Sequence, residues 1–362
     1  MKRCITLLFS LVMLAFLGAC GPATALNSDV LVPTPTPVPP NEINIYSWET
    51  YIDPQILTDF EQEFGVRVVY QTFSIEQDAF DALQNGQPYD IVVLSESGIR
   101  RMNDRRLLAL LNKENLPNLV NLDPDFLNPY HDPGNRHCVP YLWGTVGIGY
   151  NTARVNRVLN GWADLLAPAT RARFTMLDDP RTSLGLALIY LGYSPNTTNP
   201  AEIRAARDFL LAQKNRIIGY SGDEGQDQLL EGSVDIVFEW SGDIFQLQAE
   251  NPNIRYVIPE EGSVIWVDNV CIPVTARNPK MAETFINYLL RPDVAAKLAN
   301  FTHYASPNQA ARDLIIPADL KNPSIYPPDS LRRRLFTLVN LPPETLALYQ
   351  QAWAEVLEAY NR

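Results

Sequence analysis

The chain has 362 residues, of which 46% are hydrophobic and 19% charged, and its formal net charge is -12. This composition excludes a wholly disordered protein, and the length allows two to three domains with substantial cores. The acidity argues against nucleic acid as a partner and fits a cationic ligand better.

Residues 1–20 have the features of an export signal, because Lys2 and Arg3 precede an apolar stretch too short to span a bilayer. The stretch ends in LGAC (17–20), which resembles the bacterial lipobox, so we expect a signal peptide over 1–20 and lipidation of Cys20. An ordinary signal peptide with a chance cysteine is the alternative. Residues 21–41 contain PTPTPVPP, which favours polyproline II and predicts an extended tether rather than a Pro-rich ligand for another domain.

From residue 42 onward, strand-like and helix-like segments alternate. We predict a strand over 43–48, a helix over 54–64 between the N-cap Asp53 and Gly65, and a strand over 66–72. A helix over 76–84 and a buried strand over 89–94 follow. This order predicts an α/β sheet that binds ligands at the carboxyl ends of its strands.

The same alternation returns in the second half of the chain. We predict helices over 199–214, 243–249, 278–290 and 344–360, and strands over 234–240, 256–258 and 264–274. Segments 117–135, 194–200 and 317–329 are rich in Pro, Asn and Asp, which is typical of surface connections.

We find no nucleotide-binding or nucleophile motif, and therefore expect neither an enzyme nor a cofactor. His131, His137 and Cys138 lie close together, but no second cluster accompanies them, so we expect a solvated loop and no metal. The pair Asp178-Asp179 is more typical of a helix cap than of acid–base catalysis. After export, Cys138 and Cys271 would lie in an oxidising compartment, where a disulfide bond can form between them. The sequence leaves open whether they are bridged.

Aromatic and polar residues occur together at the ends of predicted strands, around Trp48, Trp240 and Trp266. A single Trp is typical of core packing, but three such places favour a site. Aromatic faces attract an ammonium charge and carboxylates accept its N–H groups, so the combination indicates a cationic amine ligand.

At these residues the sequence resembles the extracytoplasmic spermidine/putrescine-binding proteins of bacterial ABC importers, over residues 43–309. The motifs that carry the resemblance occur in the same order as in that family: IYSWETY (45–51), YDIVV (89–93), VPYLWGT (139–145), LDDPR (177–181), GSVIWVD (262–268), LRPDVA (290–295) and YASPN (304–308).

The resemblance implies a type II periplasmic-binding-protein fold, with two α/β lobes that are joined by crossing strands and close over a ligand. We expect residues 42–144 and 267–312 to form lobe 1, and 145–266 and 313–362 to form lobe 2. The matching motifs imply aromatic walls, two amine-binding acids and a polar contact from Ser95. The wall residues are Trp48, Tyr51, Trp240, Trp266 and Tyr304, and the acids are Asp179 and Asp268.

Three departures from the family pattern bear on the ligand. The family has an acid where this chain has Thr182 and an aromatic where it has Ser97, and its acid near Tyr51 is displaced to Glu49. Glu49, Glu96 or Glu239 could compensate, although each is more typical of a solvated surface.

An unpaired ammonium in a closed site is costly, so fewer acids would shift preference toward ligands with fewer amines. We therefore expect putrescine-like diamines to be at least as well suited as spermidine. The resulting hypothesis is a monomeric, lipid-anchored, extracytoplasmic protein that delivers a polyamine to an ABC permease. A binding protein or sensor for another small cationic or amino-group solute is the alternative, and an enzyme that uses the cleft is a distant one.

Overall fold

The computed structural model describes residues 41–167, 173–222 and 224–361, which all belong to one compact unit. The predicted signal peptide, the lipidation site Cys20 and the tether up to residue 40 lie outside the described residues. No helix among those that are described is long and apolar enough to cross a membrane.

The first elements are β1 (Glu42–Trp48), α1 (Pro54–Phe64), β2 (Arg67–Phe73), α2 (Glu76–Gln84) and β3 (Ile91–Leu94). Their order confirms the predicted β-α-β-α-β unit, and β1 pairs in parallel with both β2 and β3. The side chain of Asp53 accepts a hydrogen bond from the Gln55 backbone at the start of α1. Gly65, with a φ of 63°, ends the helix in the left-handed region that favours glycine.

One sheet runs through the described residues in the order β2-β1-β3-β9-β4-β7-β5-β6, with β8 on β4 and β10 on β9. This confirms an α/β fold. The remaining strands are β4 (Cys138–Asn151), β5 (Phe174–Leu177), β6 (Ile217–Ser221), β7 (Ile236–Trp240), β8 (Ile254–Val257), β9 (Ser263–Cys271) and β10 (Leu335–Thr337).

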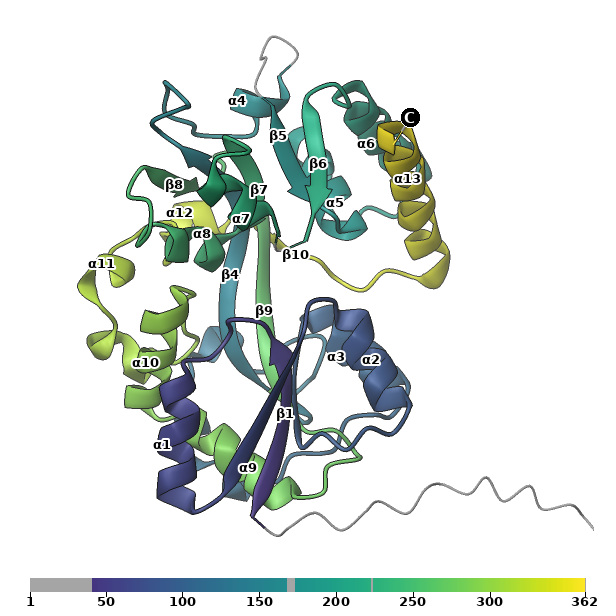
Figure 1. Cartoon of the computed structure of the whole chain (residues 1–362). Coiled ribbons are helices and arrows are strands. Elements are labelled where there is room, and N and C mark those ends of the chain that lie inside the picture. Colours follow the sequence, from purple (N-terminus) through teal and green to yellow (C-terminus); the bar gives the residue numbers. More distant parts are fainter. Residues whose placement is uncertain (1–40, 168–172, 223, 362) are drawn as a thin grey trace, which may run out of the picture. The chain divides into compact units, whose positions relative to one another are not determined.

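Strands β4 and β9 are antiparallel and link two groups of elements, one around β1, β2 and β3 and the other around β5, β6 and β7 (Figure 1). Residues 138–145 of β4 pair with β9, whereas residues 146–150 pair with β7. Near its end β9 pairs with β3, and near its start it pairs with β10. The same two strands therefore belong to the hydrogen-bonded ladders of both groups.

Helices cover the sheet in both groups (Figure 1). The predicted helices of the second half are confirmed, with boundaries that differ by a few residues. Beyond α1 and α2, the helices are α3 (Glu96–Asp104), α4 (Ala163–Leu166), α5 (Pro180–Tyr190), α6 (Pro200–Ala212), α7 (Glu224–Glu231), α8 (Ser241–Leu247), α9 (Pro279–Leu289), α10 (Pro292–Thr302), α11 (Pro317–Leu320), α12 (Asp329–Arg332) and α13 (Pro343–Asn361).

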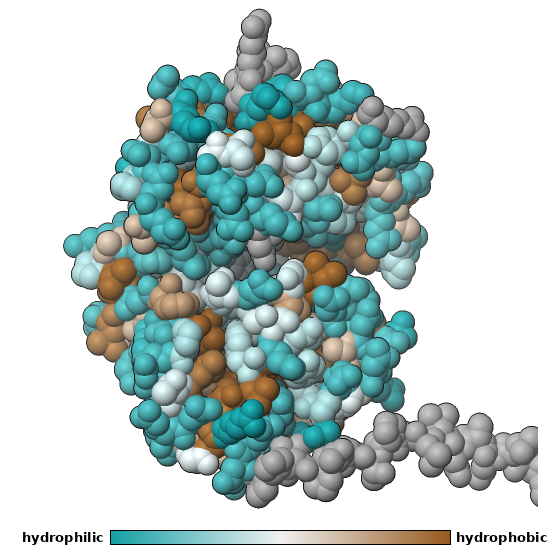
Figure 2. Space-filling model, viewed as in Figure 1, coloured by the Kyte–Doolittle hydropathy of each residue, from teal (hydrophilic) through white to brown (hydrophobic). Residues whose placement is uncertain are grey.

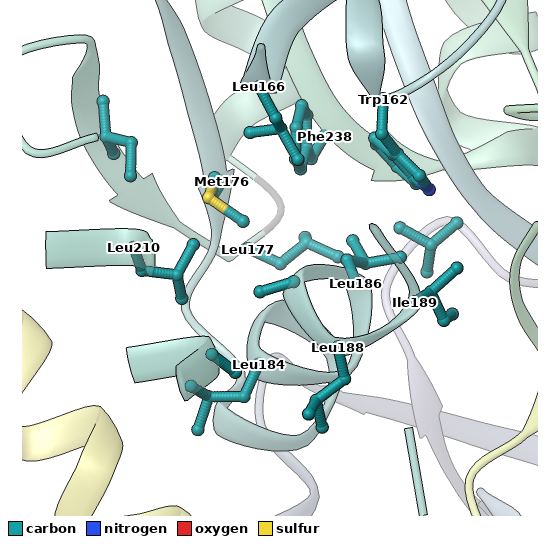
Figure 3. Close-up of a cluster of buried hydrophobic side chains, with 14 of the residues drawn as sticks. Trp162, Leu166, Met176, Leu177, Leu184, Leu186, Leu188, Ile189, Leu210 and Phe238 are labelled. Carbon is teal, nitrogen blue, oxygen red and sulfur yellow. The ribbon is translucent and has the colours of Figure 1, made fainter. Parts of the chain in front are cut away.

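Each group has its own hydrophobic core. In the group of β5, β6 and β7, the leucines of α5 pack with Trp162 and Phe238 (Figure 3). In the other group, β1 and β3 pack against α1, α9 and α10 through residues such as Ile43, Phe60 and Phe285. Because each group has a close-packed core of its own, each is rigid by itself. The shared strands β4 and β9 connect the two groups.

Cys138 and Cys271, which the sequence left open, form a disulfide bond between β4 and β9. The segment before it corrects one expectation, because residues 117–135 are not simply a surface connection. They contain short 3-10 helices over 117–121 and 124–126. His131 and Asp132 are buried, with only 6% and 2% of their surface exposed.

Candidate ligand-binding site

A buried hydrogen bond joins two of the predicted site residues, although 217 positions separate them in the chain. Tyr51 follows β1 and Asp268 lies in β9, and the Tyr51 hydroxyl donates to Asp268 Oδ2 over 2.9 Å. Tyr141 on β4 fixes the Tyr51 backbone, because its hydroxyl donates to the Tyr51 carbonyl over 2.8 Å. The carboxylate therefore has a defined position below the surface.

Four predicted wall residues form a continuous series of edge-to-face contacts. The ring centroids are 5.6 Å apart for Tyr51–Tyr304, 5.0 Å for Tyr304–Trp266 and 5.8 Å for Trp266–Trp240. Trp240 ends β7 and Trp266 lies in β9, so the series draws on elements of both groups. Such contacts hold the rings at fixed orientations.

Two glycines allow this aromatic series to pack closely. A Cβ atom on Gly144 would lie 2.6 Å from Trp266 Cζ2, and one on Gly242 would lie 2.6 Å from ring carbons of Tyr304. Real Cβ atoms do not approach so closely, so any larger residue at either position would displace a wall ring.

Trp48, the fifth predicted wall residue, is placed apart from that series. Its ring packs against Phe73, with centroids 4.5 Å apart, and joins the apolar clusters under β1 and β3. Its indole N–H is buried and has no hydrogen-bond partner among the described residues.

The predicted acid Asp179 and the predicted polar contact Ser95 both cap helices. Asp179 Oδ1 accepts from the Thr182 backbone over 2.6 Å at the start of α5, which confirms the expected cap. Ser95 Oγ accepts from the Gly98 backbone over 3.1 Å at the start of α3, and also bonds Ser97 over 2.9 Å. The two capping side chains thus lie just beyond the carboxyl ends of β3 and β5.

Asp268 belongs to a set of interacting carboxyl groups that includes Glu76, which the sequence analysis did not identify, and Glu96, which it named only as an acid that could compensate. Burial raises the pKa of Asp268 to about 7; the Tyr51 hydrogen bond opposes this shift and the charge of Glu76 adds to it. Burial and the Asp268 charge raise the pKa of Glu96 to about 8.

Burial raises the pKa of Glu76 as well, although its Oε1 accepts from the Ser95 backbone over 2.8 Å. The charge of Asp179 adds to this shift. The interactions therefore run from Glu96 through Asp268 and Glu76 to Asp179. Within the described ranges, none of these four carboxyl groups forms an ion pair with Lys or Arg. Glu76 and Asp179 do interact with the charges of Arg101 and Arg181 from beyond ion-pair distance, so Asp268 and Glu96 are the two acids that no described arginine or lysine compensates.

The nearest arginines are engaged elsewhere. Arg101 acts on Glu76 from a distance, and its guanidinium lies 3.5 Å from the centroid of the Phe80 ring. Arg181 donates to the Val339 carbonyl over 3.1 Å and to Asn196 Oδ1 over 2.9 Å.

The structure also corrects expectations about individual polar residues. Glu239 is fully buried and accepts from the Trp240 backbone over 3.0 Å, so it is not a solvated surface residue. Glu96 is mostly buried too, with 11% of its side chain exposed. Glu49 is exposed, as expected, and accepts from Ser74 over 3.1 Å.

The cluster of His131, His137 and Cys138 is neither solvated nor arranged for a metal. Cys138 is in the disulfide, and His137 Nδ1 lies 2.9 Å from Asp132 Oδ1. In the part of the chain that the structure describes, no three His, Cys, Asp or Glu side chains are grouped as metal ligands would be.

Comparisons with known proteins identify the family of the chain. A model of the family described as bacterial extracellular solute-binding protein matches residues 55–328. The chain belongs to this family. Its fold is the two-lobed periplasmic-binding-protein fold with crossing strands between the lobes, and it is a solute-binding protein that acts outside the cytoplasm rather than an enzyme.

Named relatives extend the comparison. The spermidine/putrescine-binding periplasmic protein of Escherichia coli (strain K12) is 35% identical over 290 residues, which cover 79% of this chain and 83% of the relative. The putrescine-binding periplasmic protein PotF of the same organism is 34% identical over 335 residues, which cover 87% and 90%. A solved structure titled putative spermidine/putrescine ABC transporter from Listeria monocytogenes matches with a TM-score of 0.81 and 35% identity, over 88% of this chain and 99% of that one.

Proposed function

We propose that this protein captures a polyamine such as putrescine or spermidine and delivers it to an ABC permease. The observation that carries the proposal is the buried carboxylate of Asp268, which lies beside further acids and a wall of aromatic rings and has no cationic partner among the described residues. The relatives that bear polyamine names support the same ligand class.

The chemistry of the site suits an alkylammonium ion. An ammonium group carries three N–H donors and one positive charge, so it satisfies carboxylate oxygens that the protein leaves uncompensated. Aromatic faces contribute roughly 0.5–2 kcal/mol each to a desolvated cation, and they also pack against methylene groups. A neutral solute would leave the buried acids unpaired.

Ligand capture would proceed by closure of two lobes. We assign residues 42–144 and 267–312 to one lobe and 145–266 and 313–362 to the other, because β4 exchanges β9 for β7 as its partner after residue 145. Asp268 and Tyr51 then belong to the first lobe, and Asp179, Trp240 and Trp266 to the second. A ligand that contacts both sets favours the closed form, which a permease can recognise. Figure 2 shows a largely hydrophilic face with an indentation at the level between the two groups of elements.

Attachment to the membrane completes the proposal. Lipidated Cys20 and the Pro-rich tether would hold a monomer tens of ångströms from the lipid surface, at about 3.1 Å per residue of polyproline II. The support for this step is the sequence alone, through the lipobox-like LGAC and the proline repeat.

A ligand panel read by tryptophan fluorescence tests the binding step, because Trp240 and Trp266 belong to the proposed wall. We expect putrescine or spermidine to change the emission at micromolar concentration, and glycine, glutamate and glucose to leave it unchanged. The proposal would be refuted if every polyamine had a dissociation constant of a millimolar or weaker.

A further inference from the structure

Glu96 is a buried acid that the fold holds at the edge of the candidate site. It is the first residue of α3, directly after Ser95, and 11% of its side chain is exposed. Asp268 is close enough for its charge to raise the pKa of Glu96. A carboxyl group in this position needs either a proton or a cation.

The groups around Glu96 do not supply that cation. His131 Nδ1 lies 3.8 Å from Glu96 Oε1, and burial lowers the pKa of His131 to about 4, so the imidazole is neutral. Tyr130 comes from the same segment, and partial burial together with the Glu96 charge raises the pKa of its hydroxyl to about 12. The charges of Arg100, one turn further along α3, and of Arg181 in α5 lower the pKa of the Tyr130 hydroxyl. Neither arginine forms an ion pair with Glu96 among the described residues, and Arg100 is exposed to solvent.

His131 provides a second and independent observation at this place. Its side chain is 2% exposed, and neither ring nitrogen has a hydrogen-bond partner among the residues that the structure describes. Buried polar atoms are seldom left without a partner. A neutral imidazole has one donor and one acceptor nitrogen, and the tautomer decides which of the two faces the carboxyl group. With one tautomer it can accept from a protonated carboxyl group, and with the other it can donate to an ionised one.

The segment that carries His131 is fixed by its own contacts. Asp132 Oδ2 accepts from the His137 and Cys138 backbones over 2.9 and 3.0 Å. The disulfide then joins Cys138 to Cys271, three residues beyond Asp268 in β9. His131 and Asp268 are therefore connected through one short, cross-linked part of the structure, and Glu96 lies near both.

We propose that Glu96 is a second ammonium-binding carboxylate beside Asp268, and that His131 is the positioning residue that holds it. The inference rests on the proposed polyamine function and adds a residue to its site. Before binding, the Glu96 carboxyl is largely protonated and lies 3.8 Å from the imidazole nitrogen, which keeps it beside Asp268 without a hydrogen bond. When the ligand arrives, its ammonium keeps its three protons, the carboxyl proton passes to a buffer base, and the resulting carboxylate accepts an ammonium N–H.

Calorimetric titration of the full-length protein with putrescine tests this assignment through Glu96→Gln, with Glu114→Gln as the control at an exposed acid. Run in two buffers of different ionisation enthalpy at pH 7.5, the titration gives both the dissociation constant and the number of protons released. We expect Glu96→Gln to weaken binding at least tenfold and to release fewer protons than wild type, and Glu114→Gln to stay within twofold. Binding within twofold of wild type with an unchanged proton count for Glu96→Gln would overturn the assignment.

Variants of His131 separate positioning from simple packing. His131→Phe fills the space without hydrogen bonds, and should weaken putrescine binding while the proton release remains, because Glu96 is still present. His131→Asn supplies a donor and an acceptor near the Nδ1 position, and should recover part of the affinity that Phe loses. Equal affinities for the Phe variant and wild type would remove His131 from the proposal. Absence of binding by wild type itself would instead refute the polyamine function.

Discussion

Replacement of Asp268 by Asn should have opposite effects on ligand binding and on the stability of the unliganded protein. The amide keeps an acceptor for the Tyr51 hydroxyl, now 2.9 Å from Oδ2, but it removes the charge that an ammonium group needs. Loss of one partner of a buried charge pair costs about 2–5 kcal/mol. At 1.36 kcal/mol per factor of ten, the affinity for putrescine should fall roughly 30-fold to several thousand-fold.

The same change should stabilise the unliganded fold. The pKa of Asp268 rises from 3.8 to about 7, so ionising this group in the folded state costs up to about 4 kcal/mol at alkaline pH. The folded state retains the proton longer than the unfolded state, and the cost therefore appears as the pH rises through this interval. Asn carries no such cost, and it also removes the repulsion that Asp268 exerts on Glu96.

Urea denaturation at pH 8.5 and calorimetric titration with putrescine measure the two effects on the same variant. The exposed residue Asp313 provides a matched control, and Asp313→Asn should change neither quantity. A variant that is both less stable and weaker in binding would show that Asp268 has a structural role. Unchanged affinity would remove Asp268 from the site.

Three further predictions follow from the same geometry. Putrescine affinity should rise from pH 6 to pH 8.5, because Asp268 and Glu96 have pKa values of about 7 and 8 and must ionise to bind an ammonium group, whereas an alkylammonium stays charged in this range. Calorimetry across that range measures the change, and an affinity that is flat or falls with pH would contradict the prediction. Replacing both Cys138 and Cys271 by Ser should lower the free energy of unfolding by about 5 kcal/mol, because the bridge closes a loop across a separation of 133 residues. Urea denaturation measures this, and a loss below 1 kcal/mol would count against it. Gly242→Ala should weaken putrescine binding more than tenfold, because the new Cβ would lie 2.6 Å from the Tyr304 ring. Gly219→Ala serves as the binding control, because its Cβ would make an ordinary contact of 3.4 Å with Thr175, and equal affinities for the two variants would refute the packing argument.

The local elements could be predicted well because their signals are local. Asp53 and Gly65 enclose α1 as capping chemistry requires, and Asn199 caps α6 by accepting from the Ala201 backbone. The pair Asp178-Asp179 was likewise expected to cap a helix, and Asp179 does so at the start of α5. These features depend on a few neighbouring residues and not on the rest of the fold.

The site was only partly predictable, because burial and charge interactions arise between distant segments. Nothing in the sequence spacing brings Tyr51 to Asp268, and their placement together came from resemblance to a family. Glu96 lies just after β3 and Glu239 near the end of β7, where charged residues are typically solvated. The packing of neighbouring elements buries both side chains. His131 was assigned to a solvated loop for the same reason, since its Pro- and Gly-rich surroundings resemble a surface segment.

The central claim is that uncompensated acids beside an aromatic wall bind an ammonium ligand. Its most direct test is calorimetric titration of the wild-type protein at pH 8 with putrescine and, in parallel, with 1,4-butanediol, which has the same carbon chain but hydroxyl groups in place of ammonium groups. We predict micromolar or tighter binding of putrescine and no measurable binding of the diol. Equal affinities for the two, or no binding of putrescine below millimolar concentration, would contradict the claim.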